Sequence, residues 1–149
     1  MDRNPLFPLA AFLLLVLLSV FSFMGYLLAA RRFQTPPPPT QVTVETREGT
    51  RHLRARLART PEAWSRGLGV RQEKLEALLY LFPQATDAPF SAEDYRFPVV
   101  VAFLDGEGRV LKVARLAPGE VVAPGTAYRG VLEVREGLLP LQPGDRVLP

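Results

Sequence analysis

An uninterrupted apolar run near the start of the chain decides how the rest can be arranged. It extends from Pro5 to Ala30, reads PLFPLAAFLLLVLLSVFSFMGYLLAA and contains no charged residue. A helix rises about 1.5 Å per residue, so a run of this length matches a hydrocarbon core of about 30 Å. We therefore predict a single transmembrane helix over residues 5–30, preceded by a short stub over residues 1–4.

The end of this run favours a retained signal anchor over a cleaved signal sequence. A cleaved signal has an apolar region of about 7–15 residues and small residues before its cleavage site. This run is longer, and cleavage after Ala30 would place Leu28 where a small residue is needed. The positive-inside rule compares the positive charge on the two sides of the run. Arg3 lies on one side, and Arg31 and Arg32 lie on the other, so the rule hardly favours either orientation of the helix.

A proline-rich linker separates the apolar run from the remainder of the chain. Residues 31–40 read RRFQTPPPPT. Consecutive prolines hold a polyproline II helix of about 3.1 Å per residue, which makes a short semi-rigid spacer. The residues that follow, 41–149, are enough for one small β-rich domain with its own core and too few for two domains.

The charge distribution argues against nucleic-acid binding. The whole chain has a formal charge of +3, but residues 41–149 contain 15 Lys and Arg against 14 Asp and Glu, a net charge of +1. The rest of the excess flanks the apolar run. A domain this close to neutral lacks the positive field that binding to a phosphate backbone needs.

The absence of cysteine and the single histidine limit the available chemistry. The chain can form no disulfide, no thiolate metal site and no catalytic thiol. His52 is the only histidine, so sites built from several histidines are excluded too. The sequence contains no phosphate-binding loop, dinucleotide fingerprint or metalloprotease motif. We expect no resident metal or cofactor and assign no catalytic residue.

Patterns of apolar residues predict a mainly β domain. Alternating segments, continuous runs such as LLYLF and PVVVAFL, and turns rich in Gly and Pro are typical of short strands. Thr60-Pro61-Glu62 predicts the start of one short helix, near residues 60–66. The expected architecture is a compact antiparallel β-barrel or sandwich with that one helix. Strands are expected at 41–46, 51–58, 78–82, 98–104, 109–117, 128–134 and 146–148.

Arginines crowd the segment from Arg47 to Arg59. On a strand, His52, Arg54 and Arg56 share one face because side chains alternate. We interpret this face as solvated, with a patch for anionic headgroups or polysaccharide as the alternative.

Glu93 and Asp94 form an adjacent carboxylate pair. On a strand they would point to opposite faces, which argues against paired acid–base work on one substrate. In a loop they could meet, or bind a cation through hard oxygen ligands. A solvated loop is the simpler interpretation. Trp64, on the short helix, is expected to anchor the core rather than to stack on a ligand.

Several segments resemble, in their order and spacing, a small domain that is often exported in bacteria and archaea: domain of unknown function 192. The resemblance spans roughly Leu53 to Val147. Two segments resemble the family's Arg-Gly-Leu-Met-x-Arg and Met-Leu-Phe-x-Phe, and others resemble its later strands. The matching segments are Leu57-Ala58, Arg66-Gly67-Leu68-Gly69-Val70-Arg71, Leu78-Leu79-Tyr80-Leu81-Phe82, Phe97-Pro98, Ala102-Phe103-Leu104-Asp105-Gly106, Gly130-Val131-Leu132-Glu133-Val134, Gly137 and Gly144-Asp145-Arg146-Val147.

The chain departs from this family in its most distinctive polar segment. In the family this segment usually reads Phe-Trp-Met-Lys-Asn-Thr and is followed by Pro-Leu-Asp. This chain has Phe90-Ser91-Ala92-Glu93-Asp94-Tyr95 instead, and it has Val100 at the position of the aspartate. The spacing up to Pro98 is kept, so the scaffold matches while the polar residues differ. The candidate binding residues are Arg66, Arg71, Glu93, Asp94 and Tyr95.

Together these observations predict a membrane-anchored, non-enzymatic domain that binds an envelope component, a protein partner or a glycan. Family members commonly carry export signals, so the resemblance implies a domain on the extracytoplasmic side of the cell membrane. Two alternatives stay open. One is a hydrolase that acts on envelope material through Glu93 and Asp94, and the other is a purely structural protein that assembles in the membrane.

Overall fold

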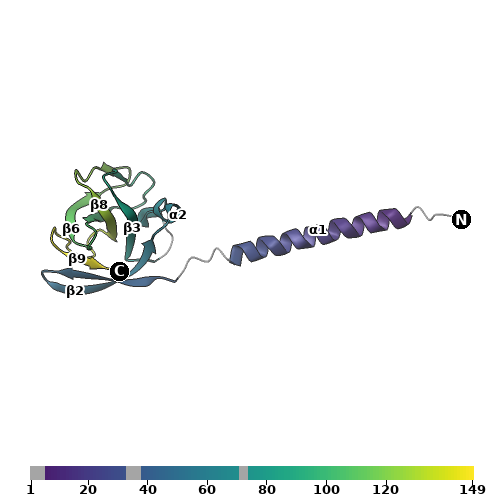
Figure 1. Ribbon diagram of the computed structural model, residues 1–149, viewed down its shortest axis with the longest axis horizontal. Helices are drawn as coiled ribbons and strands as arrows, with labels where there is room; N and C mark the ends of the chain where they lie inside the picture. The colour runs from purple at the N-terminus through teal and green to yellow at the C-terminus, as the bar shows by residue number, and fades with distance from the viewer. Residues whose placement is uncertain (1–5, 33–37, 71–73) are drawn as a thin grey trace. The chain divides into compact units, whose positions relative to one another are not determined.

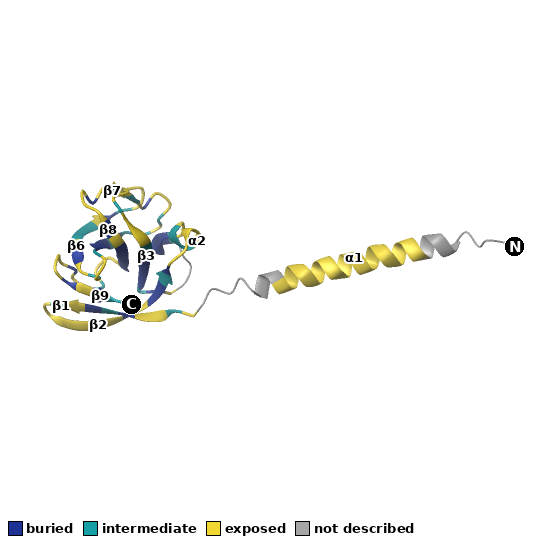
Figure 2. Cartoon of the chain, viewed as in Figure 1, coloured by how far each residue is buried: buried dark blue, intermediate teal, exposed yellow. Residues whose placement is uncertain are grey.

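The computed structural model describes residues 6–32, 38–70 and 74–149 and divides the chain into two compact units, Met1–Pro37 and Pro38–Pro149. The first unit contains helix α1 (Leu6–Arg32) (Figure 1). All side chains from residue 11 to residue 29 are exposed, and the span Ala11–Ala29 is long and apolar enough to cross a membrane by length and composition (Figure 2). The stub 1–4 and linker residues 33–37 lie outside the described residues.

The second unit is built on a seven-stranded sheet that curls into a half-barrel, with strand order β6-β5-β8-β3-β2-β1-β9 (Figure 1). A separate pair, β4-β7, lies outside this sheet. The predicted mainly β fold is therefore confirmed. The elements are β1 (Thr40–Thr46), β2 (Gly49–Ala58), α2 (Pro61–Trp64), the 3₁₀ helix η1 (Leu68–Val70), β3 (Ala77–Thr86), β4 (Phe90–Ser91), β5 (Val99–Leu104), β6 (Val110–Leu116), β7 (Val121–Val122), β8 (Tyr128–Arg135) and β9 (Arg146–Leu148).

One strand pair differs from the antiparallel expectation. Strands β2 and β3 run parallel, whereas the other paired strands among the described residues are antiparallel. Parallel neighbours need a crossover connection, and the chain supplies it through α2 and η1. The predicted helix start is confirmed: Thr60 is the N-cap, and its side chain accepts a hydrogen bond from the Ala63 amide at 3.3 Å. The α-helix is shorter than expected and ends at Trp64.

The two edges of the sheet meet at one end of the half-barrel. The Val110 amide donates to the Asp145 carbonyl, and the Val147 amide donates to the Gly108 carbonyl, each at 2.8 Å. A β-carbon at Gly108 would overlap the Val147 carbonyl oxygen, so only glycine permits this close approach. Hydrogen bonding between edges removes open edge groups that would otherwise invite pairing with other chains.

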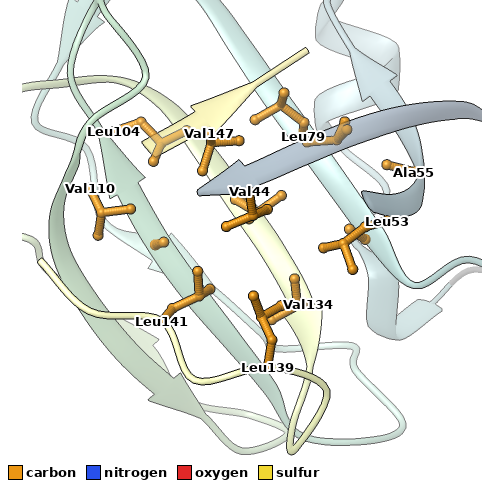
Figure 3. Packing of buried hydrophobic residues seen from close by; sticks show 14 residues of the cluster. Val44, Leu53, Ala55, Leu79, Leu104, Val110, Val134, Leu139, Leu141 and Val147 are labelled. Atoms are coloured by element: carbon orange, nitrogen blue, oxygen red, sulfur yellow. The ribbon is translucent and has the colours of Figure 1, made fainter. Parts of the chain in front are cut away.

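Both faces of the central strands are buried. The inner face forms one apolar cluster, which Figure 3 shows around Val44, Leu53, Leu79 and Val134. The outer face forms a second cluster, covered by residues of α2, η1, β4 and β7. Burial on both faces explains why β3, β5 and β8 are continuous apolar runs in the sequence. It also explains one correction, because Arg56 on the face interpreted as solvated is only 7% exposed.

Candidate binding cleft

A cleft of about 910 Å³ opens in the outer layer of the second unit, where α2, the distal half of β3 and the segment 88–95 meet. Its walls combine aromatic side chains, small residues and two carboxylates. The lining residues are Trp64, Ser65, Gly67, Val70, Tyr80, Phe82, Pro83, Gln84, Ala85, Thr86, Ala88, Pro89, Phe90, Ser91, Glu93, Asp94, Tyr95 and Tyr128.

The aromatic rings of the cleft form a connected set. Trp64 and Phe82 have ring centroids 5.0 Å apart in a tilted arrangement, and Phe82 meets Tyr128 edge-on at 5.9 Å. Tyr80 meets Phe90 edge-on at 5.3 Å. Such tilted and edge-on pairs are favoured by the quadrupoles of the rings. Each ring is thereby held in place by a neighbouring ring.

The polar atoms of these aromatic residues point into the protein. Trp64 Nε1 donates to the Ala58 carbonyl at 2.9 Å, and the Tyr128 hydroxyl donates to the Ala88 carbonyl at 2.6 Å. The Tyr80 hydroxyl donates to Glu133 Oε2 at 3.2 Å. With its polar atoms already bonded, each residue contributes its carbon surface to the cleft.

A buried carboxylate lies beneath one side of the cleft. Glu133, in β8, is 0% exposed and accepts hydrogen bonds from at least three donors among the described residues. The Leu68 amide reaches Oε2 at 2.7 Å, and the hydroxyl of Tyr95 bonds to Oε1. The third donor is the Tyr80 hydroxyl. Buried carboxylates persist when their oxygens are satisfied in this way. Glu133 therefore joins η1, β3 and the segment that carries the candidate carboxylates.

Tyr95 lies directly against the backbone of the Gly67–Gly69 turn. A β-carbon at Gly69 would be 2.7 Å from Tyr95 Cβ and would overlap the ring, and one at Gly67 would overlap the hydroxyl. The Arg96 amide donates to the Gly69 carbonyl at 3.1 Å, which ties the two segments together beside this contact. Glycine is therefore required at both positions, because the tyrosine ring occupies the space that a side chain would need.

Glu93 and Asp94 lie in a turn that is held in place by hydrogen bonds of the preceding residue, Ala92. Ala92 is fully buried; its amide donates to the Glu120 carbonyl at 2.8 Å, and its carbonyl accepts from the Tyr95 amide at 3.1 Å. The Glu93 amide donates to Ser91 Oγ at 3.2 Å. Both acidic residues are exposed and line the cleft. They are on a turn rather than on a strand.

Burial changes the titration of the two deepest tyrosines. Burial raises the pKa of the Tyr80 hydroxyl far above its ordinary value of 10.0, and the negative charge of Glu133 raises it further. Burial also raises the pKa of Tyr128, with a smaller contribution from Asp87. Both hydroxyls are therefore neutral hydrogen-bond donors at physiological pH.

The structure brings three of the five predicted residues to one place. Glu93, Asp94 and Tyr95 all line the cleft. Arg66 is exposed and lies between the lining residues Ser65 and Gly67, but does not itself line the cleft. Arg71 lies outside the described residues.

Sequence reasoning missed Glu133 and the aromatic walls. Glu133 was assigned only to a scaffold strand, although a carboxylate inside the apolar segment GVLEV is a signal of a buried, hydrogen-bonded acid. The rings come from residues between Trp64 and Tyr128, so their convergence depends on the fold. Trp64 does pack against Phe82, but it also lines the cleft.

Within residues 6–32, 38–70 and 74–149, no group of three or more His, Asp or Glu side chains is placed to hold a metal ion.

Two solved structures share this fold. The first, from Novosphingobium aromaticivorans, is a protein of unknown function that is 27% identical, with a TM-score of 0.67 over 74% of this chain and 85% of that chain. The second is a candidate transcription regulator from Sinorhizobium meliloti, which is 21% identical, with a TM-score of 0.66 over 74% of this chain and 95% of that chain. The second likeness concerns the fold alone. No curated protein matches the chain.

The family comparison covers most of the second unit. Residues 42–148 match the family DUF192, described as an uncharacterized ACR. The matched range begins in β1 and ends in β9, so it takes in every strand of the sheet and all the residues that line the cleft. The chain belongs to the DUF192 family.

Proposed function

We propose that this protein is a membrane-anchored, non-enzymatic binding module whose cleft holds a component of the cell envelope. The observation that carries the proposal is the cleft itself, in which Trp64, Phe82 and Phe90 remain only partly buried although they are large and apolar. Concave, mostly apolar sites with a few fixed polar groups are typical of ligand-binding sites. The candidate segment Glu93–Tyr95 forms part of this wall.

The first unit supports the location. Helix α1 exposes apolar side chains along residues 11–29, and the Ser19 hydroxyl donates to the Leu15 carbonyl at 2.9 Å, so this polar group needs no water. Seven residues, 33–39, separate α1 from β1 in the sequence, and a polyproline II spacer of that length would span roughly 20 Å. The binding module would therefore act close to the membrane surface. Family members are commonly exported, which favours the extracytoplasmic side.

The arrangement of the carboxylates favours binding over catalysis. Glu93 and Asp94 are exposed on a turn and are adjacent in the sequence, whereas the two carboxylates of a hydrolase lie on opposite sides of the bond that they cleave. Glu133 is enclosed, with its oxygens engaged by Leu68, Tyr80 and Tyr95. Its role in the proposal is to hold the cleft wall.

The only tryptophan of the chain provides a direct test, because Trp64 lines the cleft. We would purify the full chain in a polyoxyethylene detergent and titrate it with envelope glycan fragments and lipid headgroups while recording tryptophan fluorescence. A saturable change is expected with at least one component, and it should disappear in Ala85→Leu, which narrows the cleft. The matched control is Ala127→Leu, an exposed alanine outside this cleft.

Two results would contradict the proposal. One is a fluorescence of Trp64 that no envelope component changes although the protein is folded. The other is turnover of a glycan or lipid by the wild-type chain that Glu93→Gln or Asp94→Asn abolishes, because that result would establish a hydrolase.

A further inference from the structure

We propose that the cleft recognises an organic ammonium group, the positively charged nitrogen of an amine or a quaternary amine. This inference rests on the proposed function, because it names the chemistry of the ligand that the same cleft would hold. It follows from the aromatic lining, the charges of the lining residues and the placement of Arg129.

The rings offer π surface rather than hydrogen-bonding groups. Trp64, Tyr80 and Tyr128 each use their polar atom in a bond to the protein, at 2.9, 3.2 and 2.6 Å respectively. Phe82 and Phe90 have no polar side-chain atom to offer. The π face of an aromatic ring carries partial negative charge and attracts cations, most strongly when several rings surround them. A ligand that enters this cleft therefore meets the carbon surface of the rings, beside the neutral polar side chains of the lining, Ser65, Gln84, Thr86 and Ser91.

The charged side chains of the lining are all acidic. Among the described residues that line the cleft, Glu93 and Asp94 carry negative charge and none is Lys, Arg or His. This is a local property, since residues 41–149 as a whole carry a net charge of +1. Carboxylates at the rim and rings in the walls favour the same ligand charge, because both attract a cation and both repel an anion.

Arg129 bonds to the backbone of this wall but lies outside the cleft. Arg129 donates through Nη2 to the Pro83 carbonyl at 2.9 Å and through Nε to the Phe82 carbonyl at 3.4 Å, and it is absent from the cleft lining. It instead borders a smaller cavity next to Leu81 and Gly130. Arg129 therefore places no positive charge in the lining, and Arg66, between the lining residues Ser65 and Gly67, does not line the cleft either.

Matched ligand pairs separate charge from shape. Choline and 3,3-dimethylbutan-1-ol have the same shape, but only choline is charged. Glucosamine and N-acetylglucosamine share a sugar ring, but only glucosamine has a free amine. We would titrate each into the full chain in polyoxyethylene detergent, whose headgroup has neither an amine nor a sugar ring, and follow Trp64 fluorescence. The charged member of a pair is expected to bind at least about tenfold more tightly.

The two ligand pairs show which kind of molecule carries the ammonium group. Tighter binding of choline indicates a lipid headgroup, and tighter binding of glucosamine indicates an amino sugar. The doubly substituted variant Glu93→Gln/Asp94→Asn is expected to weaken binding of the charged ligand at least about fivefold and to leave the neutral partner unaffected. Glu107→Gln, an exposed carboxylate in a hairpin outside the cleft, is the control and should bind as wild type.

The outcomes distinguish this inference from the proposed function. If the neutral member binds as tightly as the charged member in both pairs, or if the double variant binds the preferred charged ligand as wild type does, the ammonium inference is overturned while the binding module stands. If none of the four probes binds, the inference also falls, and the envelope titration then decides the proposed function by itself.

Discussion

The carboxylate of Glu133 accepts a hydrogen bond from the hydroxyl of Tyr95, which links the middle of a buried strand to the turn that carries Glu93 and Asp94. The Leu68 amide bonds to the same carboxylate, at 2.7 Å. One enclosed acid thus determines where two walls of the cleft lie. The geometry of the cleft is therefore coupled to the stability of the sheet.

Replacing this acid by its amide should destabilise the fold. In Glu133→Gln the side-chain nitrogen is a donor, so it faces a tyrosine hydroxyl or the Leu68 amide and leaves a buried donor without an acceptor. We expect a loss of about 2–3 kcal/mol in the free energy of unfolding, measured by urea titration with Trp64 fluorescence. Glu107→Gln makes the same chemical change on the surface. Equal stabilities of the two variants would contradict this account.

The contact between Gly69 and Tyr95 predicts a specific coupling. Gly69→Ala should cost about 1–3 kcal/mol, because the new methyl group overlaps the tyrosine ring. In a Tyr95→Ala background the obstacle is gone, and the same substitution should cost little. A double-mutant cycle measures this difference. Gly106→Ala, where the nearest atom is Arg129 Cγ at 3.7 Å, is the control for the methyl group alone. Additive effects at residues 69 and 95 would refute the contact.

Closure of the half-barrel can be tested with two glycines of similar backbone angle. Gly108 has a φ of 83° and lies against Val147, whereas Gly119 has a φ of 86° with no atom within 4 Å of an added β-carbon. Both alanine variants should lose about 1 kcal/mol in the free energy of unfolding, because alanine disfavours the left-handed conformation. Gly108→Ala should lose roughly 1–3 kcal/mol more, because it pushes the sheet edges apart. Thermal unfolding of the pair would show the difference, and similar melting temperatures would mean that the edges are not joined there.

The raised pKa of Tyr80 predicts a loss of stability at alkaline pH. The unfolded chain releases this proton near pH 10, its ordinary value, while the folded chain keeps it because burial raises the pKa. The unfolded state then binds fewer protons, so stability is intact below pH 10 and falls above it by up to about 1.4 kcal/mol per pH unit. Tyr80→Phe should remove this part of the slope in urea titrations between pH 9 and 11. An unchanged slope would show that Tyr80 titrates normally.

The proposed membrane anchor can be tested by introducing a single charge. Leu18→Arg puts a cation near the middle of the span Ala11–Ala29, at a cost of about 3 kcal/mol relative to leucine. We expect a clear drop in the fraction of protein that resists alkaline extraction from membranes. Val121→Arg, at an exposed apolar residue of the second unit, should leave the fraction unchanged. Equal extraction of both variants would argue against a spanning helix.

The sequence predicted the strands well because burial on both faces leaves a strong pattern. The segment of β9, residues 146–148, was predicted with its observed bounds, and LLYLF lies within β3. The two-residue strands β4 and β7 were missed, since so short a pairing has no periodicity. The burial of Arg56 was missed for a related reason: strand alternation separates faces but does not say which face another layer covers.

The site was predictable only in part. The segment Glu93–Tyr95 was identified because it differs from the family's polar segment at matched spacing. The rings that complete the cleft were not, because Trp64, Phe82 and Tyr128 are apart in the sequence and meet only after the crossover between β2 and β3 has formed. The partner of Tyr95 at Glu133 is likewise separated from it by 38 residues.

The pairing of β1 determines how the second unit would bear a pulling force. This strand follows the proline spacer directly, and it is hydrogen-bonded to β2 through a register that runs from Thr40–Ala55 to Thr46–Gly49 and to β9 on its other side. If α1 is anchored and the cleft holds a ligand, as we propose, tension between them would enter the second unit through β1 and be shared by two ladders of backbone hydrogen bonds. The aromatic walls lie on other elements, so a pull on the tether would strain the sheet before it distorts the cleft.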